Sequence, residues 1–159
     1  MKRKRILLFI LWMIFDATHR SDAAITISLS GSWSETVDSS DIIIGSEIML
    51  PSTYTSSSSA VTMNIGANGS ESWIVLVSKY DSVWDPRLHL FLRRTGNGSG
   101  NGNISGGTSF QEIGALNQTL CSGKKQLSGI PVQFQLTGIT LNIPPASRST
   151  TITYTITAP

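Results

Sequence analysis

Short stretches in which apolar and polar residues alternate run through most of the chain and predict β-strands. The clearest covers residues 148–157, where Ile152, Tyr154 and Ile156 alternate with threonines. Successive side chains of an extended strand point to opposite faces, so these three large apolar groups would share one face. Pro144 and Pro145, just before it, have no backbone N–H to donate to a sheet ladder. They therefore indicate that residues 148–157 enter a sheet as a new strand and do not continue the preceding strand. We therefore expect a C-terminal strand with one buried side.

The same period-two pattern predicts further strands, with turn signals at intervals of roughly ten residues. Trp73 to Val77 is apolar on both faces, which is typical of a central strand. Asn68-Gly69 is a hairpin-type turn signal, so residues 61–65 and 73–79 are expected to pair with each other. Across Thr137-Gly138 the apolar positions change from even to odd, which predicts a β-bulge or a turn. The expected strands are 25–33, 42–44 (short and buried), 61–65, 73–79, 88–94, 110–120, 130–136, 139–143 and 148–157.

This pattern, without sustained helical periodicity, predicts an all-β fold: an immunoglobulin-like β-sandwich of about 7–9 antiparallel strands. Gly96 to Gly107 is almost entirely Gly, Asn and Ser. Because it lacks the lysine and spacing of a phosphate-binding loop, we interpret it as a flexible hairpin tip. Asp38 to Asp41 is interpreted as a turn rather than a calcium loop, since no further carboxylates stand at the spacing that calcium loops need.

The N-terminus has the layout of a secretory signal peptide. Four basic residues, Lys2 to Arg5, precede the apolar run Ile6 to Phe15, and small residues follow at Ala23. The run is shorter than the roughly 20 residues that span a bilayer, although a retained membrane anchor is the alternative. The predicted organisation is a signal peptide, 1–23, and one β-sandwich domain, 24–159. The protein would then be secreted or displayed at the cell surface, and would meet the membrane only through the signal during export.

The overall positive charge belongs to this leader. From residue 24 onward, seven basic and eight acidic residues remain, a net charge of −1. Nucleic acids and anionic lipids are bound through clustered Lys and Arg, so neither is an expected partner. The isolated pairs Arg93-Arg94 and Lys124-Lys125 are interpreted as solvated strand ends or turns.

Cys121 is the sole cysteine, so an intrachain disulfide is impossible. We interpret it as a buried or idle thiol, with a bridge to another subunit as the alternative. After residue 24 the chain has a single histidine, His89, and no nucleophile motif or metal-ligand set. We therefore expect neither an enzyme nor a bound cofactor.

Aromatic residues suggest one alternative function. Small secreted sandwiches commonly bind sugars through exposed aromatic rings, and Trp84, Trp33 and Tyr80 are the candidates for stacking on a glycan. This reading requires at least two surface aromatics on one face.

The C-terminal third has a recognisable pattern. Residues 130–138 (IPVQFQLTG), 143–146 (IPPA) and 149–157 (STTITYTIT) together resemble the end of bacterial secreted pilin-like β-sandwiches, the spore coat protein U and chaperone-usher fimbrial type. The chain departs from that family in lacking the disulfide that many such pilins carry.

The resemblance implies a structural or adhesive appendage subunit, with transit through the periplasm if the source is Gram-negative. It also implies donor-strand assembly with other copies or with a related envelope subunit or chaperone. The candidate assembly strand carries Ile25, Ile27 and Leu29. The alternative is that these residues form the first strand of their own sheet.

Overall fold

Residues 25–45 and 48–159 are described by the structure, a computed structural model. Within them the chain is all-β, with two antiparallel sheets arranged as a β-sandwich and one short 3-10 helix, Ser39–Asp41. The all-β prediction is confirmed. The predicted signal peptide, 1–23, lies outside the described residues. No helix within the described ranges is long and apolar enough to cross a membrane.

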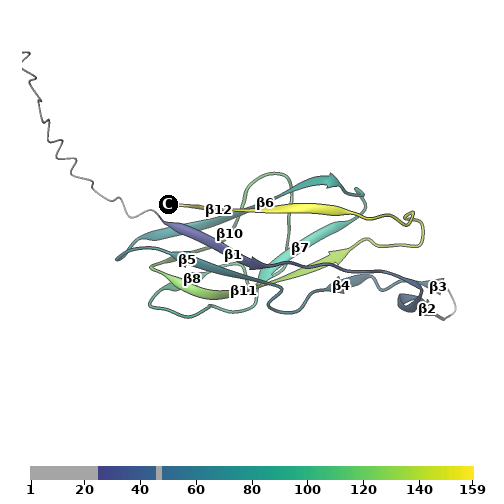
Figure 1. The fold of residues 1–159 in the computed structure, drawn as a ribbon, viewed down its shortest axis with the longest axis horizontal. Helices are drawn as coiled ribbons and strands as arrows, with labels where there is room; N and C mark the ends of the chain where they lie inside the picture. Colours follow the sequence, from purple (N-terminus) through teal and green to yellow (C-terminus); the bar gives the residue numbers. More distant parts are fainter. Residues whose placement is uncertain (1–24, 46–47) are drawn as a thin grey trace, which may run out of the picture.

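The larger sheet has six strands and the smaller has four (Figure 1). The six-stranded sheet runs in the order β1 (Thr26–Gly31), β5 (Val61–Gly66), β11 (Leu127–Thr137), β7 (His89–Arg94) and β9 (Gln111–Glu112), with β4 (Thr53–Thr55) also paired to β11. The four-stranded sheet runs in the order β12 (Ser149–Thr157), β6 (Ser72–Val83), β10 (Gln118–Lys124) and β8 (Asn103–Ser105). A separate hairpin pairs β2 (Ile43–Ile44) with β3 (Ile48–Met49).

The core lies between the inner faces of the two sheets. Trp73, Val75 and Val77 alternate along β6 and are fully buried, as are Met63 and Val132 on the opposing sheet. Burying each such side chain stabilises the fold by roughly 1.5–3 kcal/mol before entropy costs. The indole Nε1 of Trp73 donates to a backbone carbonyl 2.8 Å away, at Lys125, so its polar atom is satisfied as well.

Strand β12 follows the prediction for the C-terminal stretch. It joins the four-stranded sheet, whereas the preceding strand β11 lies in the six-stranded sheet, so the prolines at 144 and 145 do separate two sheets. Ile152, Tyr154 and Ile156 are half-buried against the core. The opposite face carries threonines.

Four strand predictions are wrong. Residues 110–120 do not form one strand: Gln111–Glu112 (β9) lies in the six-stranded sheet and Gln118–Lys124 (β10) in the four-stranded one. Strands β5 and β6 do not pair; they lie in different sheets, because alternation fixes which face is buried but not which strand is the neighbour. Residues 139–143 form no strand, since the chain turns at Gly138, whose φ is 85°. Ile43 and Ile44 do form a short strand, but both are exposed rather than buried.

The glycine-rich segment is part of the fold rather than a flexible tip. Ser99 and Ser128 exchange backbone hydrogen bonds of 2.7 and 2.8 Å, and β8 pairs with β10. Arg94, expected at the surface, is 5% exposed and donates to the carbonyls of Gly96 and Gly106 and to the side chain of Asn97. Its guanidinium therefore anchors this segment against the sandwich.

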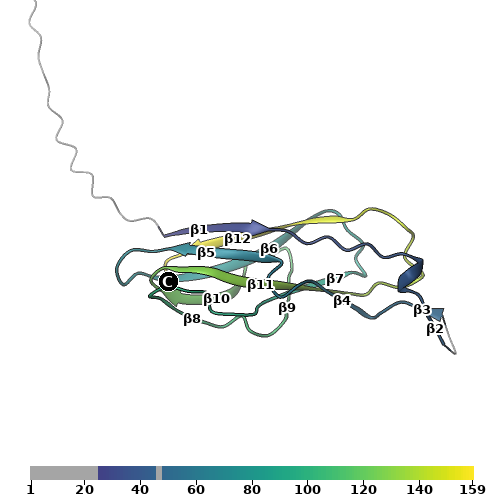
Figure 2. The same cartoon turned by 60° about the horizontal axis from the view of Figure 1, so that its bottom comes forward.

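The first and last strands lie side by side on the same side of the molecule. Strand β1 forms one edge of the six-stranded sheet and β12 one edge of the four-stranded sheet (Figures 1 and 2). The β2–β3 hairpin projects at the end of the sandwich farthest from the C-terminus (Figure 2). Between β12 and the segment that follows β1, the sandwich is open.

Candidate functional site: an open groove between the sheets

An open groove of about 1140 Å³ lies between the two sheets where β1 ends. Leu90 and Leu136, paired across β7 and β11, line one wall together with Phe134. Ile152 and Tyr154 of β12 line the opposite wall. These two walls are apolar because the alternation of both sheets turns large side chains inward at these positions.

One rim of the groove is the extended segment 32–37. Its backbone makes no hydrogen bond to the backbone of any other described residue, although it continues directly from β1. Trp33 holds it in place, because its indole stacks on Phe134 with ring centroids 6.1 Å apart and an interplanar angle of 4°. The rim therefore presents unpaired N–H and C=O groups beside an apolar wall.

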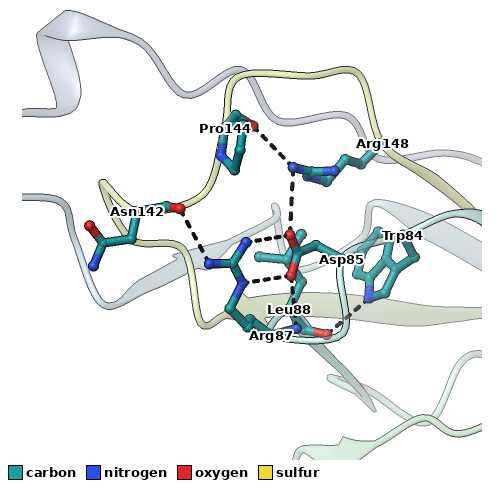
Figure 3. Close-up of polar contacts among 7 residues, drawn as sticks. All are labelled: Trp84, Asp85, Arg87, Leu88, Asn142, Pro144 and Arg148. Atoms are coloured by element: carbon teal, nitrogen blue, oxygen red, sulfur yellow. Dashed lines mark hydrogen bonds and ion pairs between the residues drawn. The ribbon is translucent and has the colours of Figure 1, made fainter.

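The other rim, residues 139–148, is held by an ion-pair cluster around Asp85, which is 9% exposed (Figure 3). Arg87 donates two hydrogen bonds to the Asp85 carboxylate, of 2.9 and 2.8 Å, and a third of 3.2 Å to the carbonyl of Asn142. Arg148 lies 3.6 Å from the same carboxylate and donates to the carbonyl of Pro144. Two arginines thus tie this rim to the turn between β6 and β7.

The ion-pair cluster around Asp85 also holds the turn between β6 and β7 in place. The backbone N–H of Arg87 donates to Asp85 Oδ1 at 3.0 Å, and the indole of Trp84 donates to the carbonyl of Leu88 at 2.9 Å. The hydrogen bonds from Arg87, together with the positive charges of Arg87 and Arg148, hold the pKa of Asp85 well below its usual range. The carboxylate is therefore ionised at neutral pH and keeps the rim in place.

The groove has the geometry of a strand-accepting site. From Thr150 to Thr157, the edge of β12 that faces away from β6 pairs with no described strand. An extended peptide lying between this edge and the segment 32–37 could bond to backbone groups on both sides and bury its apolar side chains against the groove wall.

The candidate assembly residues lie next to the groove, in a strand that pairs within its own chain. Strand β1 is antiparallel to β5 through six residue pairs, from Thr26 with Gly66 to Gly31 with Val61. Ile25 and Ile27 are half-buried against the core, whereas Leu29 is 42% exposed and lines the groove.

The three candidate sugar-stacking aromatics are not brought together on one face. Trp33 and Trp84 both line the groove, but Trp33 is stacked on Phe134, and Trp84 has the ammonium of Lys79 over its ring at 5.1 Å. Tyr80 is 72% exposed and, by strand alternation, lies on the outer face of β6, opposite Val77.

Cys121 is buried at 1% exposure, and this burial raises the pKa of its thiol to about 11. The thiol is therefore protonated at neutral pH and inaccessible to solvent in this fold. The neighbouring Tyr154 hydroxyl is also buried; it has no hydrogen-bond partner among the described residues, and desolvation raises its pKa.

His89 lies at the surface, with its Nδ1 2.6 Å from a carboxylate oxygen of Glu112. Within residues 25–45 and 48–159, no three His, Cys, Asp or Glu side chains are grouped so that they could hold a metal ion. The Asp38–Asp41 stretch is a turn, as expected, because Asp38 caps the short 3-10 helix by accepting from the Ser40 N–H at 2.7 Å.

Sequence reasoning did not identify the Asp85 cluster or the exposed hairpin. Asp85 was visible in Trp84-Asp-Pro, a turn sequence, but its partner Arg148 is 63 positions away, and no local pattern joins them. In the hairpin, the run Ile42 to Ile44 stands out in the sequence, but a run of apolar residues predicts burial rather than exposure.

The sequence matches no protein-family model, and neither curated proteins nor solved structures give a significant match.

Proposed function

We propose that this protein is a secreted structural subunit of a cell-surface or appendage assembly, with an immunoglobulin-like sandwich whose groove receives a β-strand from another chain. The open groove beside the unpaired edge of β12 is the observation that carries this proposal. This groove is the most distinctive surface of the residues that the structure describes.

The size and chemistry of the groove favour a polypeptide over a small molecule. Its volume of about 1140 Å³ exceeds the roughly 300–1,000 Å³ of common small-molecule pockets. Two unpaired backbone edges flank it, and main-chain hydrogen bonds give affinity when a strand is added to a sheet edge. Apolar positions at every second residue of an incoming strand would then meet the wall formed by Leu136 and Ile152.

The first candidate for the incoming strand is the N-terminal stretch of a second copy. Ile25, Ile27 and Leu29 alternate with polar residues, as a groove-filling strand requires. Donating β1 in trans has a cost, because Ile25 and Ile27 would leave the core of their own chain and β5 would lose its neighbour.

The size distribution of the exported chain tests the proposal, alongside a version lacking residues 24–30, which keeps Trp33 and the rim segment 32–37. Donor-strand assembly predicts heat-labile ladders for the full chain and a folded monomer for the truncated one, which an added peptide of residues 25–33 should bind. A control peptide with serine in place of Ile25, Ile27 and Leu29 should not bind. A full chain that stays monomeric at every concentration and binds neither peptide would show the proposal to be wrong.

Glycan binding is the second candidate, because Trp33 and Trp84 line the same groove. It predicts that the monomer binds a polysaccharide and that Trp84→Ala weakens binding without changing self-association. Loss of self-association in this variant would instead support the structural role.

A further inference from the structure

Arg94, at the end of β7, is a buried cation. Its side chain is part of a residue that is only 5% exposed, and among the described residues no carboxylate forms an ion pair with it. Its hydrogen bonds go to neutral oxygens, which are the carbonyls of Gly96 and Gly106 and the side-chain Oδ1 of Asn97. A charge removed from water is costly unless an opposite charge compensates it. A carboxylate beside Arg94 would therefore stabilise the fold.

Asn97 is the partner of Arg94 that can become such a carboxylate. Of the three oxygens that accept from the guanidinium, only Oδ1 of Asn97 belongs to a side-chain amide, which deamidation converts to an acid. The next residue is Gly98. Asparagine deamidates most readily before glycine, because glycine has no side chain to hinder attack by its own backbone nitrogen.

The groups that would react at Asn97 are available. Within the described part of the chain, the backbone N–H of Gly98, the nucleophile, donates to no oxygen, and the side-chain nitrogen of Asn97, the leaving group, makes no hydrogen bond. Asn97 is exposed, so water reaches it. The hydrogen bond from Arg94 to Oδ1 draws electrons from Cγ and stabilises the negative charge that develops on this oxygen during the attack.

We infer that Asn97 deamidates in the folded protein and that the resulting aspartate pairs with Arg94. The backbone nitrogen of Gly98 loses its proton to water and forms a bond to Cγ of Asn97, the side-chain nitrogen leaves as ammonia, and a five-membered succinimide remains. Water then adds at Cγ, and cleavage of the new C–N bond restores the normal backbone with a carboxylate at position 97. The net reaction consumes one water and releases one ammonia, without an oxidant or a reductant.

Two features favour aspartate over isoaspartate, the other product of succinimide hydrolysis. The hydrogen bond from Arg94 activates the carbonyl at Cγ, so water adds there. Isoaspartate would insert one extra carbon into the main chain just before Ser99, whose backbone exchanges hydrogen bonds of 2.7 and 2.8 Å with Ser128. A lengthened backbone would disturb this pair, whereas aspartate keeps it.

The turn at Asn68 provides a control within the same molecule. Asn68-Gly69-Ser70 has the same sequence as residues 97–99, and Asn68 is also exposed. Its side chain contacts no arginine of the described chain; instead, its backbone N–H donates to the carboxylate of Glu71 at 2.8 Å. Deamidation at Asn68 would therefore gain no counter-charge.

This inference is independent of the groove, because neither Arg94 nor Asn97 lines it. Arg94 anchors the glycine-rich segment to the sandwich, so a carboxylate at position 97 would hold that segment more firmly. The reaction would be a maturation step that needs no other protein.

Peptide mapping by mass spectrometry, during incubation of the exported chain at neutral pH, measures the reaction. We expect Asn97 to convert faster than Asn68, with aspartate as the main product at 97 and isoaspartate at 68. Arg94→Lys keeps a positive charge but loses the fork of donors, and it should slow conversion at Asn97 about tenfold or more without changing Asn68. Asn97 that stays an amide, or that converts more slowly than Asn68 in the original chain, would overturn the inference.

Asn97→Asp installs the product directly and leaves Arg94 in place. It should raise the melting temperature by several degrees, because the buried guanidinium gains a counter-charge. Asn68→Asp is the matched control and should give no rise, since it adds a negative charge beside Glu71. A melting temperature of Asn97→Asp at or below that of the freshly purified original chain would show that Arg94 does not favour the carboxylate and that the inference is wrong.

Discussion

Arg148, just before the last strand, lies 3.6 Å from the carboxylate of Asp85 and so ties the groove rim 139–148 to the turn between β6 and β7. Asp85→Asn should release the rim 139–148 and lower the melting temperature by several degrees, because both arginines lose their counter-charge. Glu112→Gln is the control: it removes the exposed pair with His89 and should change the melting temperature little. Equal effects of the two substitutions would contradict the role given to Asp85.

The carboxylate of Asp85 should also make the stability of the protein vary with pH in the acid range. Because the folded state lowers the pKa of Asp85 below its ordinary 3.8, the unfolded chain takes up this proton first as pH falls. The contribution of Asp85 should be fully present above about pH 4–5 and be lost progressively below. Urea unfolding of the original chain and of Asp85→Asn should therefore differ at pH 6, and the difference should shrink toward pH 2.

The buried thiol of Cys121 should make the stability of the protein fall at alkaline pH, the opposite direction from the effect of Asp85. Its folded-state pKa of about 11 is above the ordinary 9.0, so the unfolded chain ionises first as pH rises. Stability should be unaffected below pH 9 and should decline between pH 9 and 11, and Cys121→Ala should remove part of this decline. In the native protein at pH 8, Cys121 should also react with an alkylating reagent only as fast as the chain unfolds; rapid labelling would show that the thiol is accessible.

Gly123 is a position where the core tolerates no side chain. A Cβ there would lie 2.2 Å from the carbonyl oxygen of Asn103 and 2.4 Å from the ring of Trp73. Gly123→Ala should destabilise the protein by about 1–3 kcal/mol, the usual range for overpacking. Gly114→Ala, where a Cβ meets nothing within 4 Å, should have little effect. Chemical denaturation of both variants measures the difference.

Tyr154→Phe tests a buried hydroxyl without a partner. Removing it should leave stability unchanged or raise it by about 1 kcal/mol, because a buried polar group that makes no hydrogen bond costs free energy. A clear loss of stability would reveal a hydrogen bond to this hydroxyl.

Local patterns predicted the strand content well but not the pairing. The alternation in Ile152 to Ile156 correctly gives a strand with one buried face, because the period of the side chains is a local property. Asn68-Gly69, read as a hairpin turn, in fact leads from one sheet to the other, since the neighbour of each strand is decided by contacts distant in sequence.

The groove could not be predicted from local sequence patterns. Its rims depend on the pairing of Asp85 with Arg148 and the stacking of Trp33 on Phe134, which join residues 63 and 101 positions apart. Isoleucines at 43 and 44 indicated burial because apolar runs in small domains are commonly core. An apolar segment that is exposed, as this one is, has the same sequence pattern.

The placement of the chain's last residue has a consequence for display. Strand β12 ends at the opposite end of the sandwich from the β2–β3 hairpin (Figures 1 and 2). The groove opens next to this hairpin, because Ile42 and Leu50, on either side of the hairpin, line it. A ligand or enzyme fused after Pro159 would therefore stand away from this mouth of the groove and leave it uncovered.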